Sequence, residues 1–171
     1  MAKRIHLPSG ALVVFAVLAA VVAAGLAPSA AQPKPPIRWT APTAAVSGAA
    51  GSTIKVEVSA QIDEGWHLYA LTQTPPPDPT RIVVADAQPF ALAGKIEAPV
   101  PESGFDKAQG ADTEYYVEAV TFKLPLSVAR GTAPGRHVAK VKATWQACNG
   151  SLCLRPQTVT LDVPVQVTAA R

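Results

Sequence analysis

The sequence has few of the residues on which many catalytic and binding sites depend. Its 171 residues include only two cysteines and three histidines, and 16% are charged. Two cysteines are too few for a disulfide scaffold, so a folded domain must depend on a packed core. The sequence has no Ser/His/Asp cluster at motif spacing, no phosphate-binding loop and no paired-carboxylate signature. Hydrolase and kinase chemistry therefore have no support.

Long apolar stretches are also scarce, and the one present lies near the N-terminus. Ala11–Ala27 is an uncharged run that follows Lys3 and Arg4 and precedes the small residues Ser29–Ala31. This order is typical of a secretory signal, so we predict that residues 1–31 are a signal peptide cleaved on export to the periplasm. An uncleaved anchor is the alternative, because the run reaches the lower end of the roughly 17–25 residues that a membrane helix needs.

Strong net charge is absent from the predicted mature chain. Removing residues 1–31 takes away two basic residues and no acidic one, so the net charge falls from +3 to +1. No basic patch remains, and we expect no nucleic-acid partner. The 140 residues left are enough for one hydrophobic core. We therefore predict one domain, residues 37–167, after a proline-rich lead-in at residues 32–36.

Helical periodicity is missing too, and a period of two takes its place. The chain has 17 prolines, which break helices but suit turns and edges. Apolar and polar residues alternate, as in half-buried strands, at residues 54–59, 120–126, 139–147 and 159–165. Short strands separated by Gly/Pro turns predict an all-β sandwich of two sheets, with a small barrel as the alternative.

Two segments are predicted to be loops because they lack this alternation. The first is Thr72–Pro79, "TQTPPPDP", and the second is Pro99–Thr113, "PVPESGFDKAQGADT". The second is long for a compact domain. Long ordered loops are often functional, although a mobile insertion without a role is an equal alternative.

The two cysteines, Cys148 and Cys153, flank the sequence Asn-Gly-Ser-Leu. Asn-Gly is a strong signal for a tight turn, so we predict a hairpin that brings the cysteines close enough to bond. Cys148 continues a set of alternate polar residues on the preceding strand, which predicts an accessible side chain. That set is Lys140, Lys142, Thr144 and Gln146.

Three interpretations of the pair are possible. A staple that closes a loop of about six residues would add only roughly 2 kcal/mol, less than a longer loop would give. A zinc site would need both His67 and His137 to converge on the cysteines, and neither lies at ligand spacing from a partner. A redox pair needs an accessible sulfur and a second cysteine to resolve the mixed disulfide. The residues alone leave the structural and redox interpretations open.

Three segments resemble one known family. The most specific is "TWQACNGSLCLRPQTVTLDVPV", Thr144–Val165; the others are "GWHLYA", Gly65–Ala70, and "EYYVEAVTFKLPL", Glu114–Leu126. They resemble the N-terminal periplasmic domain of the transmembrane thiol:disulfide interchange protein DsbD, over most of residues 37–167. The resemblance implies an immunoglobulin-like β-sandwich and a cysteine pair that cycles between dithiol and disulfide.

The resemblance also assigns roles to individual residues. It implies that Cys153 forms the mixed disulfide with a partner and that Cys148 resolves it. A flexible lid carrying an aromatic ring covers the cysteines in this family, and Phe105 is the candidate here, with an ordinary loop aromatic as the alternative. Tyr69 and His67 match positions beneath the site, where a tyrosine at position 67 would be more usual, and we give His67 no catalytic role.

Several further residues complete the expected site and its surroundings. Leu152, beside the second cysteine, is expected to line the site. Trp145 falls on the apolar face of its strand and is predicted to lie in the core. Trp66, Tyr115 and Tyr116 are predicted to be packing groups.

The resemblance further implies protein-disulfide reductase-type exchange with no organic cofactor and no metal. In the family, electrons reach this hairpin through a thioredoxin-like domain and pass to periplasmic disulfide isomerases or cytochrome c maturation proteins. This chain stops after one such domain. We therefore expect a separate thioredoxin-like donor and a separately encoded membrane electron-transfer protein. The alternative is an exported immunoglobulin-like binding module whose disulfide is structural.

Overall fold

The computed structural model describes residues 34–170, which fold entirely into strands, turns and connecting loops. The predicted signal peptide, residues 1–31, lies outside the described residues, as do residues 32 and 33 of the proline-rich lead-in. Within residues 34–170 the chain forms no helix capable of crossing a bilayer.

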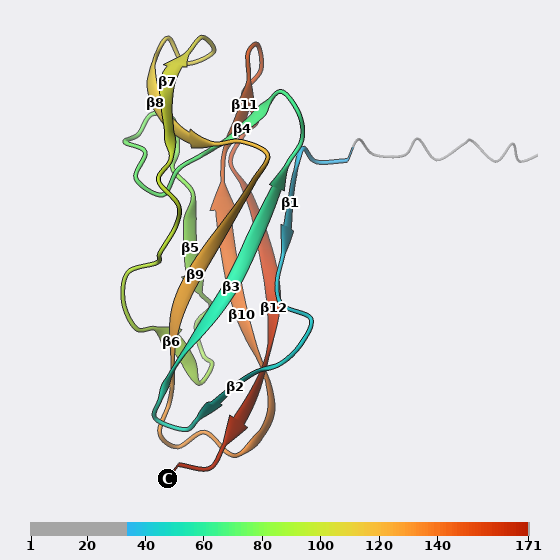
Figure 1. The fold of residues 1–171 in the computed structure, drawn as a ribbon, viewed down its shortest axis with the longest axis vertical. Helices are drawn as coiled ribbons and strands as arrows, with labels where there is room; N and C mark the ends of the chain where they lie inside the picture. The colour runs from blue at the N-terminus through green and yellow to red at the C-terminus, as the bar shows by residue number, and fades with distance from the viewer. Residues whose placement is uncertain (1–33, 171) are drawn as a thin grey trace, which may run out of the picture. The chain divides into compact units, whose positions relative to one another are not determined.

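In residues 34–170, twelve strands form three four-stranded sheets (Figure 1). The first sheet has the order β1 (Ile37–Thr40), β3 (Thr53–Ile62), β9 (Ala119–Val128), β6 (Phe90–Leu92). The second sheet has the order β2 (Val46–Ala49), β12 (Gln157–Thr168), β10 (Gly135–Trp145), β5 (Arg81–Val84). The third sheet has the order β11 (Ala147–Asn149), β4 (Trp66–Tyr69), β8 (Ala111–Tyr116), β7 (Glu102–Asp106).

The first two sheets form the immunoglobulin-like sandwich that the resemblance implied. Long antiparallel pairs, β3 with β9 and β10 with β12, run through their centres. The alternate residues that the sequence pattern marked as apolar are buried on all four of these strands, apart from Val159, which is half-buried. Their side chains merge into one hydrophobic core. This core therefore supplies the stability that two cysteines could not supply. Trp145 is 4% exposed and belongs to the core, as predicted.

The third sheet lies at the end of the sandwich opposite the last residues of β12 (Figure 1). Its strand β11 contains Cys148. Its strand β4 follows β3 through a turn in which the carbonyl of Asp63 accepts the N–H of Trp66 at 3.1 Å. Gly65 occupies that turn with φ of +77°, a conformation that glycine adopts readily. Strand β11 continues β10 after a break at Gln146 and pairs with β4 in the third sheet.

The prediction that Pro99–Thr113 is a loop is wrong for most of its length. This segment contains strand β7 and the start of β8, which pair as an antiparallel hairpin. Glu102 lies opposite Tyr115 at one end of the pairing, and Asp106 lies opposite Ala111 at the other. The hairpin has no apolar alternation because backbone hydrogen bonds, rather than one buried face, hold its strands together. By contrast, Thr72–Pro79 forms no strand, as predicted.

Candidate functional site

The two cysteines form a disulfide across the turn that follows β11. The turn is closed by the N–H of Asn149, which donates to the carbonyl of Leu152 at 2.9 Å. The Asn149 side-chain oxygen accepts the N–H groups of Ser151 at 2.9 Å and Leu152 at 2.8 Å. The Asn-Gly signal thus predicted the hairpin correctly, and an asparagine side chain stabilises it by mimicking a backbone turn.

The two cysteines differ in their exposure to solvent. Cys148 is fully buried at 0% exposure, whereas Cys153 is partly exposed. The prediction that Cys148 is accessible because it continues the polar set of β10 is wrong. The break at Gln146 moves the chain from one sheet to another, so parity counted along β10 does not extend to β11.

A hydrogen-bonded network lies directly behind Cys148. His67 and Tyr69 project from the same face of β4, and both contact the same carboxylate oxygen of Asp106. The Tyr69 hydroxyl is 2.6 Å from Asp106 Oδ2 and 2.7 Å from Cys148 Sγ. His67 Nε2 is 2.8 Å from Asp106 Oδ2. The Tyr69 hydroxyl has one proton for these two acceptors, and the carboxylate is the stronger acceptor while the cysteines are in a disulfide.

This network shifts the pKa values of its two buried acids in opposite directions. Burial, followed by the hydrogen bond to Asp106 and that residue's negative charge, raises the pKa of Tyr69 well above its usual value. Burial alone would raise the pKa of Asp106. Hydrogen bonds from Tyr69, His67 and the backbone N–H of Ala108 outweigh burial and hold that pKa below its usual value. At neutral pH the site therefore contains an ionised carboxylate next to a neutral phenol.

The tip of the β7–β8 hairpin covers the disulfide, and we call residues 102–116 the cap hairpin. Asp106 organises the tip, because its Oδ1 accepts the N–H of Ala108 at 2.8 Å and its carbonyl accepts that of Gly110 at 2.7 Å. The amide nitrogen of Gln109 lies 3.1 Å from Cys153 Sγ and 3.7 Å from Cys148 Sγ. Gln109 therefore shields both sulfurs from the solvent side.

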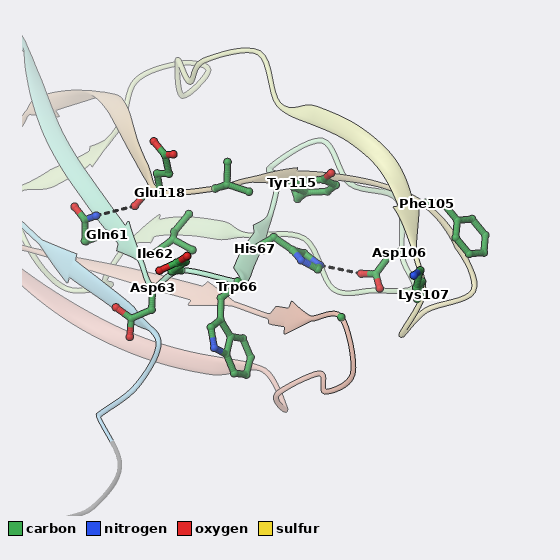
Figure 2. Close-up of a pocket in the computed structure, with 14 residues that line it drawn as sticks. Gln61, Ile62, Asp63, Trp66, His67, Phe105, Asp106, Lys107, Tyr115 and Glu118 are labelled. Atoms are coloured by element: carbon green, nitrogen blue, oxygen red, sulfur yellow. Dashed lines mark hydrogen bonds and ion pairs between the residues drawn. The ribbon is translucent and has the colours of Figure 1, made fainter.

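The predicted lid residue, Phe105, lies on the cap hairpin but is 65% exposed. Figure 2 shows its ring projecting outward from β7, whereas Asp106 points toward His67. The alternation of side chains along a strand explains this difference between neighbours. The structure thus brings Phe105 to the hairpin that covers the disulfide, and its role as a lid stays a prediction.

Other predicted residues surround this centre at greater distance. Leu152 is 54% exposed on the cysteine turn. Tyr115 packs against the His67 ring with a centroid separation of 4.9 Å, and Tyr116 is buried in the core. His137 lies on β10, where Nε2 contacts the carbonyl of Ala133 at 2.8 Å, so it does not join His67 in a shared metal site.

Sequence reasoning missed two residues, Asp106 and Gln109. Both belong to the cap hairpin that was predicted to be a loop. The sequence "DKAQG", residues 106–110, contains a signal for the turn at the tip of this hairpin, because Asp and Gly at the ends of a short polar segment favour a turn.

An open cavity of about 890 Å³ adjoins the site (Figure 2). His67 and Asp106 form part of its wall, Phe105 and Lys107 come from the cap hairpin, and Gly150 comes from the cysteine turn. The cavity therefore lies beside the cysteine turn, and neither cysteine forms part of its wall.

These features define a class of protein: an immunoglobulin-like β-sandwich with a disulfide at one end, which contacts a buried tyrosine and is covered by a hairpin that carries the aspartate bonded to that tyrosine. The chain belongs to the family described as the N-terminal domain of the thiol:disulfide interchange protein DsbD, whose sequence pattern matches residues 38–164. This match confirms the resemblance stated from the sequence.

The solved structures similar to the chain include two N-terminal domains. The N-terminal domain of DsbD from Neisseria meningitidis, in its reduced form, is 18% identical with a TM-score of 0.50; the match covers 78% of this chain and 90% of that one. The N-terminal periplasmic domain of ScsB from Proteus mirabilis is 19% identical with a TM-score of 0.50; the match covers 74% of this chain but 44% of that one. At such identities the likeness supports the fold. No curated protein matches the chain significantly.

Proposed function

We propose that the chain is a periplasmic thiol–disulfide interchange module that passes electrons through the Cys148–Cys153 pair. One observation carries the proposal beyond family membership: one cysteine is buried and the other is partly exposed. A structural staple has no need for this difference. An exchanging pair needs one sulfur that a partner can reach and one held back to resolve the mixed disulfide.

The proposed cycle has two half-reactions. A donor thiolate attacks Cys153 Sγ, the bond to Cys148 breaks, and Cys148 leaves as a thiolate. The donor's second thiol then resolves the mixed disulfide, so the donor becomes a disulfide and the module a dithiol. In the second half-reaction the Cys153 thiolate attacks an oxidised substrate, and Cys148 displaces the substrate thiolate. Two electrons and two protons move from donor to substrate.

The surroundings of Cys148 suit its role as the leaving and resolving group. In a buried site a thiolate is stabilised only if a donor faces it. The Tyr69 hydroxyl, 2.7 Å from Cys148 Sγ, can turn its proton from Asp106 toward the thiolate when the disulfide opens. In this proposal Tyr69 acts as a positioning residue, and the cap hairpin must move before a partner can reach Cys153.

The family implies redox partners in the periplasm, and we propose their chemical type. A thioredoxin-like protein or domain is the expected electron donor, and a membrane electron-transfer protein is expected to reduce that donor. Oxidised periplasmic proteins are the expected acceptors. We also propose that residues 1–31 direct export and that residues 37–167 form the exchanging domain.

Trapping a mixed disulfide tests this proposal. A Cys148→Ala variant keeps the attacking Cys153 but cannot resolve. We therefore expect it to accumulate a covalent complex with a thioredoxin-like protein whose second cysteine is replaced and whose first is activated as a mixed disulfide with glutathione. A Cys153→Ala variant is the matched control and should form none, because its remaining sulfur is buried. Non-reducing electrophoresis with and without dithiothreitol measures both.

If neither variant, correctly folded, forms an adduct, the exchange proposal fails. That result would favour an exported immunoglobulin-like binding module with a structural disulfide. An adduct formed only by Cys153→Ala would reverse the assigned roles of the two cysteines.

A further inference from the structure

Three potential metal ligands from three strands converge behind the disulfide. They are His67 on β4, Asp106 at the end of β7 and Cys148 on β11, and one ligand atom from each lies within 4.8 Å of the others. The His67 side chain is 16% exposed and that of Asp106 1% exposed. Cys153 lies outside this triad, with its sulfur 3.8 Å from the Tyr69 hydroxyl. Once its bond to Cys148 is reduced, it would supply a fourth ligand atom by turning toward the other three.

The oxidation state of the cysteines decides whether this cluster can bind a metal ion. Disulfide sulfurs are poor ligands, whereas thiolates bind thiophilic ions strongly. The reduced site offers two sulfurs, one imidazole nitrogen and one carboxylate oxygen. This is a ligand set that Zn²⁺ accepts in tetrahedral geometry.

The ligand atoms of His67, Asp106 and Cys148 lie within 4.8 Å of one another, a range that includes the separations of a zinc site. Zinc–ligand bonds of about 2.0–2.3 Å arranged tetrahedrally separate neighbouring ligand atoms by roughly 3.3–3.8 Å. His67 Nε2 and Asp106 Oδ2 lie 2.8 Å apart, so they need to separate by about half an ångström. The Tyr69 hydroxyl, 2.6 Å from Asp106 Oδ2, can keep donating to the carboxylate and hold it in place.

The charges of the ligand set also suit a divalent cation. With both sulfurs bound as thiolates and Asp106 bound as a carboxylate, the ligands would carry three negative units. A divalent cation among them would offset most of that charge.

We propose that the reduced module binds one Zn²⁺ ion through His67, Asp106, Cys148 and Cys153. The proposal rests on the exchange function, because a dithiol donor must first convert the disulfide to two thiols. Binding then releases two protons: one Zn²⁺ replaces the proton of each thiol, with no change of oxidation state. Zinc-bound sulfurs cannot attack a substrate, so the ion holds the module inactive until it is removed.

Zinc titration of the mature protein tests the proposal. Two samples are titrated with Zn²⁺ against a chromophoric chelator: protein reduced with a phosphine, and protein that is kept oxidised. We expect one equivalent to bind the reduced form alone and to protect both cysteines from alkylation. His67→Gln should weaken binding at least tenfold, because losing even an outer-shell partner of a ligand typically costs 10–100-fold in affinity. His137→Gln, which alters a histidine outside the cluster, is the control and should bind as the unaltered protein does.

A second measurement needs no variant. Co²⁺ bound to the reduced protein should show the visible absorption of a tetrahedral ion and the ultraviolet charge-transfer band of thiolate ligation. Equal zinc affinity in the His67→Gln and His137→Gln variants, or no binding to fully reduced folded protein, would overturn the zinc site and leave the exchange function standing. A disulfide that cannot be reduced without unfolding would overturn both.

Discussion

The cap hairpin gives the sharpest prediction about access to the disulfide. The structure places the Gln109 amide 3.1 Å from Cys153 Sγ, while the Phe105 ring is 65% exposed. The family resemblance predicts that Phe105 shields the pair. The observed geometry predicts that Gln109 does. The substitutions Gln109→Ala and Phe105→Ala separate these two possibilities.

The magnitude follows from the contact that must break before a small thiol can attack. A neutral hydrogen bond contributes about 1 kcal/mol, which corresponds to roughly a fivefold change in rate. We therefore expect Gln109→Ala to speed reduction by dithiothreitol about fivefold. The backbone N–H of Gln109, which donates to Asp106 Oδ1 at 3.2 Å, is retained in the variant. Stability should change by less than about 0.5 kcal/mol, as for most surface substitutions.

Stopped-flow or quenched alkylation under native conditions measures the second-order rate constant of reduction. Lys107→Ala is the matched control, because Lys107 is exposed on the same turn and, in the described structure, makes no hydrogen bond to either sulfur. Phe105→Ala should change the rate less than about twofold on the same reasoning. A large acceleration in Phe105→Ala with none in Gln109→Ala would refute the reasoning and restore the aromatic lid.

Two further predictions concern the network behind Cys148. Tyr69→Phe removes a hydroxyl that donates a hydrogen bond to the buried Asp106 carboxylate. Hydrogen bonds to charged groups contribute roughly 1.5–3 kcal/mol, so the free energy of unfolding, measured in urea, should fall by about that amount. A loss below about 0.5 kcal/mol would show that the bond is unimportant. The lowered pKa of Asp106 means that its carboxylate stabilises the fold above its ordinary range near pH 4 and loses this contribution as the pH falls through the lowered value. Urea midpoints at about pH 6 and about pH 2.5 should therefore differ more for the unaltered protein than for Asp106→Asn; equal differences would contradict the assignment.

The sandwich could be predicted from the sequence because alternation reports burial directly. On β3 and β9, residues such as Val56, Val58, Phe122 and Leu124 follow a strict period of two and are fully buried. Such a pattern arises only where one face of a strand packs on a core. The cysteine turn was predictable for a different reason, since Asn149 and Gly150 form a local signal that needs no knowledge of the rest of the fold.

The cap hairpin and the burial of Cys148 could not be predicted in the same way. Strands β7 and β8 pair through backbone groups, so their sequence carries little information about the pairing. Asp106 and Gln109 reach the disulfide only because that hairpin folds over a turn located about forty residues further along the chain. The burial of Cys148 depends on the change of sheet at Gln146, which strand parity does not reveal.

His67 shows how a resemblance and a structure inform each other. The resemblance placed it beneath the site but offered no partner for it. The structure supplies that partner in Asp106, whose carboxylate also binds Tyr69. A histidine that looked isolated in the sequence is therefore part of the network that contacts the buried cysteine.

The reduction potential of the Cys148–Cys153 pair in the folded mature domain is the most direct test of the central claim. Equilibration in glutathione or dithiothreitol buffers, followed by alkylation, measures it. Exchanging pairs have potentials between roughly −180 and −270 mV, and we predict a value in this range for protein that remains folded. A value below about −300 mV, or reduction only on unfolding, would contradict the claim and make the bond a structural disulfide.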